Sequence, residues 1–151
     1  MTACLTIDSP LGPLTLHAQD GAITALTWEE ATDAQAPTPL LQEAAAQLAA
    51  YFDGRLTRFD LPLRVEGSDF QKAVCAQMSA IPYGETRTYG DLARALGQPA
   101  QAVGGACGAN PIPILIPCHR VVGANGLTGF SGAGGVETKA ALLRLEGALL
   151  I

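Results

Sequence analysis

The chain has 151 residues, of which 48% are apolar, and a formal net charge of −5. It is long enough and apolar enough for one good core or two small ones, which excludes a disordered chain. No run approaches the ~20 apolar residues of a membrane span, and residues 1–12 lack the Lys or Arg of a signal peptide. We therefore expect a monomeric, cytoplasmic protein that makes no membrane contact.

The negative charge is concentrated in the N-terminal part. Residues 1–67 hold nine acidic and three basic residues, a balance of −6, whereas residues 68–123 hold four basic and three acidic residues, a balance of +1. Basic contacts to phosphates dominate affinity for DNA. DNA binding is therefore permitted only in the second part, where we expect it to be weak and very sensitive to salt.

Alternating apolar residues predict three strands, at 3–7, 14–18 and 22–28, separated by turns rich in Pro, Gly and Asp. Thr38-Pro39 predicts the start of a helix whose apolar spacing continues to Phe52, and Asp53-Gly54 ends it. We predict a small α/β N-terminal domain with antiparallel strands. Residues 54–67 are the expected linker, with an extended stretch at 61–63, so this domain spans residues 1–67.

Three helices are predicted next. The capping box Ser68-x-x-Gln71 opens the first, Thr88-x-x-Asp91 caps the second, which Gly97 ends, and the third runs from Pro99 to about residue 109. Two short helices joined by a tight glycine turn are typical of a helix-turn-helix, although any helical hairpin gives this pattern.

A last helix is predicted over 136–146, with Gly147 as its stop. The predicted fold class is therefore α/β (α+β), in which residues 68–151 form a helical domain like a winged helix-turn-helix.

The most informative residues are Pro117-Cys118-His119-Arg120. Prolines on both sides of a short apolar run make the approach to Cys118 stiff. His119 and Arg120 supply positive potential, which we expect to lower the pKa of the Cys118 thiol. Cys118 is thus a candidate nucleophile, with a buried structural cysteine as the alternative.

The other cysteines, Cys4, Cys75 and Cys107, show no paired spacing, and with only two histidines the chain has no convincing zinc set. We expect reduced thiols and no metal.

Glu146 shares the apolar face of the last helix, because it follows Leu142 and Leu143 by four and three residues. A buried carboxylate needs a partner. Periodicity leaves open an acid that reaches solvent at the helix end and a salt bridge to an arginine such as Arg120.

Residues 110–122, Asn-Pro-Ile-Pro-Ile-Leu-Ile-Pro-Cys-His-Arg-Val-Val, resemble the active-site segment of the methylated-DNA–protein-cysteine methyltransferases. The resemblance covers most of residues 68–147 and, more loosely, the N-terminal third. It implies a single-use DNA repair protein that needs no cofactor. Cys118 would take the alkyl group from O6 of a flipped guanine and keep it as S-alkylcysteine.

The resemblance also implies roles for neighbouring residues. Glu146 would orient His119, and His119 would take the thiol proton of Cys118. Adjacent helical residues do not face each other, so we expect a bridging water between Cys118 and His119. Tyr89 is the implied hydroxyl donor to the leaving guanine, with an aromatic core residue as the alternative. Asn110 would hold the turn that follows it and hydrogen-bond near the thiolate.

The third predicted helix is implied to enter the minor groove of duplex DNA. Ala102 and Gly105 belong to a surface of alanines and glycines, whose small or absent side chains let the helix backbone approach a narrow groove. The family usually has an arginine where Gln101 stands, a group that fills the place of the flipped nucleotide, so the strength of flipping is in question. We assign Arg120 to the same DNA and substrate surface.

The glycine-rich stretch 123–135 is predicted to be a loop. By resemblance it walls the pocket for the alkylated base with Phe130 and Ser131; a plain surface wing is the alternative. Two other functions stay open: an alkyltransferase-like protein that binds lesions without transfer, and a cysteine hydrolase, which would turn over without DNA.

Overall fold

The computed structural model describes residues 2–31, 35–124, 126 and 135–148. The chain divides into two compact units, residues 1–64 and 65–151. Within the described residues, no helix is both long and apolar enough to cross a bilayer.

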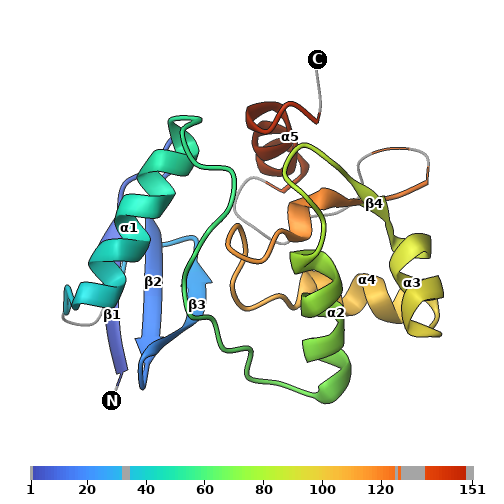
Figure 1. Cartoon of the computed structure of the whole chain (residues 1–151), viewed down its shortest axis with the longest axis horizontal. Coiled ribbons are helices and arrows are strands. Elements are labelled where there is room, and N and C mark those ends of the chain that lie inside the picture. Colours follow the sequence, from blue (N-terminus) through green and yellow to red (C-terminus); the bar gives the residue numbers. More distant parts are fainter. Residues whose placement is uncertain (1, 32–34, 125, 127–134, 149–151) are drawn as a thin grey trace. The chain divides into compact units, whose positions relative to one another are not determined.

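The first unit is an antiparallel sheet with one helix (Figure 1). Its strands, β1 (Thr2–Ile7), β2 (Leu14–Gln19) and β3 (Ala22–Thr27), lie in the order β1-β2-β3. Asp20 and Gly21 both have positive φ, 50° and 83°, which suits the tight turn between β2 and β3. The three predicted strands are confirmed to within one residue at each end.

Helix α1 (Pro39–Phe52) packs against β1 and β2 with its buried side chains, Leu41, Ala44, Leu48 and Tyr51. The predicted cap is confirmed, since the Thr38 hydroxyl accepts a hydrogen bond from the Leu41 amide at 3.3 Å. The predicted extended stretch lies beside β3, where Ile23 pairs with Leu63 in parallel.

The second unit is mainly helical. It contains α2 (Asp69–Ser79), α3 (Tyr89–Leu96), α4 (Ala100–Gly108) and α5 (Val136–Leu145). The predicted Thr88 cap of α3 is confirmed, with Asp91 completing a capping box, and Gly97 ends this helix in the left-handed conformation with φ of 63°. The capping box predicted at Ser68 is only half formed: the Ser68 hydroxyl accepts from the Gln71 amide at 3.1 Å, but the Gln71 side chain donates to the Ala106 carbonyl. Helices α3 and α4 contact each other across this short turn, as the helix-turn-helix prediction requires.

Two elements of the second unit have no sequence signal. Strands β4 (Arg87–Thr88) and β5 (Val121–Val122) pair in parallel, but two residues are too few to show a period. Between them in sequence lies η1 (Cys118–Arg120), a single 3-10 turn whose three residues are all buried. Because β4 immediately precedes α3 and β5 immediately follows η1, this pairing ties the helix-turn-helix to the turn that carries Cys118.

Candidate active site

A tight turn brings the chain to Cys118. Ile114 has φ of 71°, an uncommon conformation for a β-branched residue, and the Leu115 amide donates to the Pro113 carbonyl across it at 2.8 Å. Asn110 spans this turn: its side-chain oxygen accepts from the Ile112 amide at 3.0 Å, and its side-chain nitrogen donates to the Ile116 carbonyl at 2.8 Å. The approach to Cys118 is therefore fixed by both the backbone and the Asn110 side chain.

Cys118 is the first residue of η1, and only 7% of it is exposed. Its amide donates to the Ile116 carbonyl at 2.8 Å. Burial raises the pKa of this thiol, while a hydrogen bond from Asn110 and the charge of Lys139 lower it by less. The expectation that His119 and Arg120 lower this pKa was wrong, because desolvation of the anion outweighs the favourable contacts.

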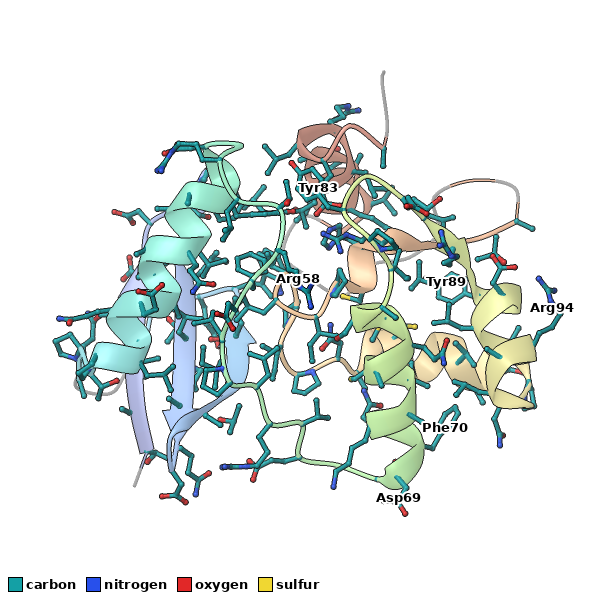
Figure 2. The ribbon with its side chains drawn as sticks, viewed as in Figure 1. Arg58, Asp69, Phe70, Tyr83, Tyr89 and Arg94 are labelled. Carbon is teal, nitrogen blue, oxygen red and sulfur yellow. The ribbon has the colours of Figure 1, made fainter. Side chains whose placement is uncertain are left out.

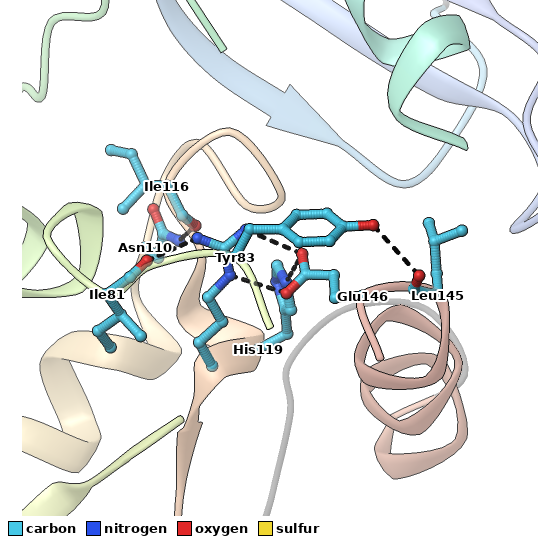
Figure 3. A network of polar contacts seen from close by, with 8 residues as sticks. Ile81, Tyr83, Asn110, Ile116, His119, Leu145 and Glu146 are labelled. Atoms are coloured by element: carbon cyan, nitrogen blue, oxygen red, sulfur yellow. Dashed lines mark hydrogen bonds and ion pairs between the residues drawn. The ribbon is translucent and has the colours of Figure 1, made fainter. Parts of the chain in front are cut away.

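His119, Arg120 and Glu146 form a buried polar network (Figure 3). The Nε2 of His119 lies 2.8 Å from Oε2 of Glu146. Arg120 donates from Nε to Oε1 at 2.8 Å and from a terminal nitrogen to Oε2 at 2.9 Å, so both carboxylate oxygens are held. Both partners that were considered for Glu146 are therefore bonded to it at once.

This network shows that Arg120 belongs to the interior. All three of its guanidinium nitrogens donate within the protein, the third to the Ile81 carbonyl at 2.7 Å. Only 8% of the residue is exposed. Its assignment to the DNA and substrate surface is corrected accordingly, because a guanidinium that is buried and held by three internal acceptors does not reach a phosphate outside the protein.

The protonation of His119 follows from its surroundings. Burial lowers the pKa of its imidazole, Glu146 opposes this shift, and the charges of Arg120 and Lys139 add to it. An ionised carboxylate can only accept, so Nε2 carries the hydrogen and Nδ1 presents a lone pair. Among the described residues, none hydrogen-bonds Nδ1, which is itself buried. Nδ1 is therefore the group that can take a proton.

Lys139 is a site residue that sequence reasoning missed. Its side chain is completely buried, and its ammonium lies 5.7 Å from the centre of the Tyr89 ring. Burial lowers the pKa of Lys139, and the nearby thiols Cys118 and Cys107 counter this shift. The signal was present, since Lys139, Leu143 and Glu146 have the i, i+4, i+7 spacing of one helix face.

Tyr89 opens α3 and is half-buried (Figure 2). An added Cβ on Gly104 would lie 4.0 Å from its ring, so Tyr89 is placed beside α4 as well as beside Lys139. Gln101, Ala102 and Gly105 are all exposed on α4. They form a surface separate from the buried network of Glu146.

The remaining expected site residues, Phe130 and Ser131, lie outside the described residues. The four cysteines are all buried, and they form no disulfide with one another. In the described part of the chain, no three His, Cys, Asp or Glu residues are grouped so that they could hold a metal ion.

The fold and the site together define a helix-turn-helix protein with a buried cysteine next to a His–Glu pair. Residues 69–148 match the family description "6-O-methylguanine DNA methyltransferase, DNA binding domain", and residues 3–65 match the ribonuclease-like domain of the same proteins. The chain belongs to the methylated-DNA–protein-cysteine methyltransferase family.

Individual relatives agree with this assignment. A methylated-DNA–protein-cysteine methyltransferase of Mycobacterium tuberculosis is 49% identical over 93% of this chain and 90% of its own length. The constitutive enzyme of Bacillus subtilis is 42% identical, covering 93% of each chain. A crystal structure of M. tuberculosis OGT in complex with DNA has a TM-score of 0.86 at 49% identity, over 97% of this chain and 93% of that one.

Proposed function

We propose that this protein repairs DNA by moving an alkyl group from O6 of guanine to the thiol of Cys118. The sulfur forms a bond to the alkyl carbon, the bond from this carbon to O6 breaks, and the electron pair returns to guanine. The observation that carries the proposal is the buried Cys118 thiol next to a His119–Glu146 pair in a member of this family. No group among the described residues of the site would hydrolyse a thioether, so we expect each molecule to act once.

The buried network supports a specific route for the thiol proton. Glu146 holds Nε2 of His119, which leaves Nδ1 as the base. We propose that a bridging water carries the proton from Cys118 to Nδ1, since both residues belong to one short turn and do not face each other directly. Asn110 would hold the turn and stabilise the thiolate by hydrogen bonding.

Two further groups would bind the guanine as it leaves. The hydroxyl of Tyr89 is proposed as the donor that relieves negative charge on the base, supported by its position at the start of α3. Phe130 and Ser131 are proposed to wall the base pocket, by resemblance alone. The reaction needs no cofactor, because the thiol is the only acceptor and the base departs intact.

The exposed face of α4 is the proposed DNA contact. An added Cβ on Gly105 would meet no described atom within 4 Å, so packing among the described residues does not explain this helical glycine, which costs about 1 kcal/mol relative to alanine. Close approach of a DNA backbone is a physical reason to keep it. We propose that residues 68–151 bind duplex DNA through the minor groove, with Gln101 and Ala102 beside Gly105.

The remaining proposals concern the whole protein. We propose that it acts as a monomer in the cytoplasm. A lesion-binding protein without transfer is the less favoured alternative, since the acceptor cysteine is present and the curated relatives are named as methyltransferases.

Intact mass spectrometry after incubation with duplex DNA that contains O6-methylguanine tests the function. The protein should gain one methyl group, which peptide mapping should place on Cys118. Cys118→Ser should keep binding the DNA but gain no mass. Binding without any mass gain in the unaltered protein would favour the lesion binder, and turnover of an ester or amide without DNA would favour a cysteine hydrolase.

A further inference from the structure

The function proposed above uses His119 and Glu146, but it gives Arg120 no role. Yet Arg120 makes three of the shortest buried polar contacts in the second unit, at 2.7, 2.8 and 2.9 Å. Two of these hold the carboxylate of Glu146 in the paired geometry typical of strong arginine–carboxylate bonds. Arg120 therefore controls the group that orients His119.

Arg120 is itself held by the turn that follows α2. The Ile81 carbonyl accepts from its third nitrogen, and its guanidinium carbon lies 5.8 Å from the centre of the Tyr83 ring. The Tyr83 hydroxyl donates to the Leu145 carbonyl at 3.2 Å (Figure 3). Gly84 packs so closely that an added Cβ would meet the Glu146 carbonyl at 3.3 Å. This turn, residues 81–84, thus supports Arg120 and the end of α5 together.

The arrangement fixes how charge is shared. Glu146 has no exposed side-chain surface, and its single negative charge is neutralised by Arg120. A proton on His119 would therefore add an uncompensated positive charge to a buried site, next to Arg120 and the ammonium of Lys139. Such a charge is expensive away from water. The neutral imidazole is the form that this site favours.

We propose that Arg120 is a positioning residue that holds the resting Cys118–His119 pair in its neutral, thiol–imidazole form. By keeping Glu146 ionised and aligned, it fixes the hydrogen of His119 on Nε2 and leaves Nδ1 as the acceptor. By supplying the compensating charge, it prevents spontaneous transfer of the proton from Cys118 to His119. A protein that uses its cysteine once gains from this restraint, because a thiol reacts with stray electrophiles and oxidants far more slowly than a thiolate.

The groups that face this pair are few enough to test. His119 is influenced by Lys139 of α5, by Glu146 at the end of that helix and by Arg120 of η1. Cys118 is influenced by Lys139, by Cys75 of α2 and by Cys107 of α4. Tyr83, in the turn after α2, faces Glu146 and Arg120. Lys139 adds to the effect of Arg120 through the charge of its ammonium. Replacing Arg120 should therefore release most of the restraint, while Lys139 continues to act.

The decisive experiment is an NMR titration of the protein with isotope-labelled histidine. The chain has two histidines, so His17 serves as the internal reference. In the unaltered protein, His119 should stay neutral with its hydrogen on Nε2 down to a pH below 6.5. In Arg120→Met, Glu146 keeps its charge but loses its compensation, so the pKa of His119 should rise by about one unit or more. The matched control Arg144→Met removes an exposed arginine of α5 and should leave the His119 titration unchanged.

A second readout follows the thiol. In Arg120→Met, the proton should pass more readily from Cys118 to His119, so more of the protein should hold the reactive thiolate. Cys118 should then react with iodoacetamide about tenfold faster or more at pH 7, since one pKa unit corresponds to a factor of ten. Arg120→Lys keeps the charge but cannot hold both oxygens; there His119 should stay neutral with a mixed tautomer. If Arg120→Met fails to fold, the proposal is tested by the His119 tautomer, which should be mixed in Arg120→Lys and should carry its hydrogen on Nε2 in the unaltered protein.

Three outcomes would overturn the proposal: an unchanged His119 titration in Arg120→Met, a resting His119 with its hydrogen on Nδ1, or a charged His119 at neutral pH in the unaltered protein. The restraint matters only if Cys118 is the alkyl acceptor, so the inference rests on the proposed function. Neither readout uses alkylated DNA. Failure of methyl transfer from DNA would therefore refute the function while leaving the titration result intact.

Discussion

At the scale of single residues, the main physical problem of this site is the buried thiol. Burial raises the pKa of Cys118, so at neutral pH the resting group is a thiol and not a thiolate. The nearby Cys107 is in a still less favourable position, since burial raises its pKa to about 12. What distinguishes Cys118 is the adjacent base, His119, together with the bond to Glu146 that orients it.

His119 should make the protein sensitive to mild acid. Burial lowers the pKa of His119 in the folded protein below 6.5, so at mildly acidic pH His119 binds a proton more readily in the unfolded chain than in the folded protein. As pH falls below 6.5, the free energy of unfolding should therefore decrease, by at most about 1.4 kcal/mol per pH unit, until the folded pKa is reached. Denaturant unfolding at pH 5 to 7 measures this slope.

The two histidines provide the comparison for that slope. His119→Gln should abolish it between pH 5 and 6.5, and His17→Gln should preserve it. A slope that survives in His119→Gln would mean that another group takes up the proton.

Residue-level prediction from the sequence reached only part of this site. The stripe of Leu142, Leu143 and Glu146 was enough to place the carboxylate on the apolar face of the last helix. It could not decide between an acid that reaches solvent and a salt bridge to an arginine, because periodicity places a side chain on a face but does not say what it meets. The Ile81 carbonyl and the Tyr83 ring were beyond prediction, since contacts formed 39 residues apart leave no local pattern.

At the scale of the element, α5 and its C-terminal cap carry two of the three charged groups of the site. Lys139 and Glu146 lie seven residues apart, two turns along one face of the helix. Their opposite charges act on different partners: Glu146 on His119, and Lys139 on Cys118.

Replacing Lys139 should therefore change the thiol. In Lys139→Met, the pKa of Cys118 should rise further because the ammonium that favours the thiolate is gone. Alkylation by iodoacetamide at pH 8 should slow by about tenfold, which corresponds to one pKa unit. The stability should not fall, because a buried lysine with a lowered pKa is replaced by an apolar side chain of similar length.

Lys72→Met is the matched control for Lys139→Met, since Lys72 is exposed on α2. It should leave the alkylation rate unchanged. Equal rates in all three proteins would show that the ammonium of Lys139 does not act on Cys118.

Helix α4 should show a conflict between stability and binding. Gly105→Ala should raise the free energy of unfolding by up to about 1 kcal/mol, because the site has room for a Cβ and alanine favours the helix. The same methyl group should weaken binding to duplex DNA if the backbone approaches the groove here. Urea unfolding and fluorescence anisotropy with a labelled duplex measure the two effects.

Gly67→Ala, an exposed glycine outside α4, should leave the affinity for DNA unchanged. If Gly105→Ala binds DNA as tightly as the unaltered protein, this face of α4 is not the DNA contact.

Element prediction succeeded where periodicity is long. The 14 residues of α1 and the six-residue strands each repeat an apolar spacing several times, and both were predicted with correct bounds to within one residue. The two-residue strands β4 and β5 were missed because their pairing depends on residues more than 30 positions apart. Propensity could not have revealed them.

At the scale of the whole molecule, charge separates the two units. The acidic excess belongs to residues 1–67, whereas the stretch from 68 to 123 has a balance of only +1. The arginines around α3 are already paired, Arg87 with Glu85 at 3.1 Å and Arg94 with Asp91, although Arg94 extends outward (Figure 2). Few phosphates can then be neutralised, so affinity for undamaged DNA should be low at physiological salt.

Gln101 links the weak electrostatics of DNA binding to the cost of extruding the damaged base. Extruding a base costs a few kcal/mol, and an exposed glutamine offers no charge to hold the opened duplex. The protein should therefore favour lesions that are already easy to unstack, in single strands or opposite mismatched bases. Gln101→Arg should accelerate repair of duplex DNA more than repair of single strands, and it should steepen the dependence of log affinity on log salt by about 0.9, one phosphate contact.

Single-turnover rates on both substrates test this prediction, with Gln98→Arg as the control. Gln98 is exposed in the turn before α4, so its replacement adds the same charge nearby but outside the helix. It should steepen the salt dependence without favouring the duplex. If Gln101→Arg accelerates both substrates equally, the added charge only attracts DNA, and Gln101 does not occupy the position from which a side chain replaces the flipped base. A selective gain on the duplex would instead mean that base extrusion, and not thiol chemistry, limits the unaltered protein.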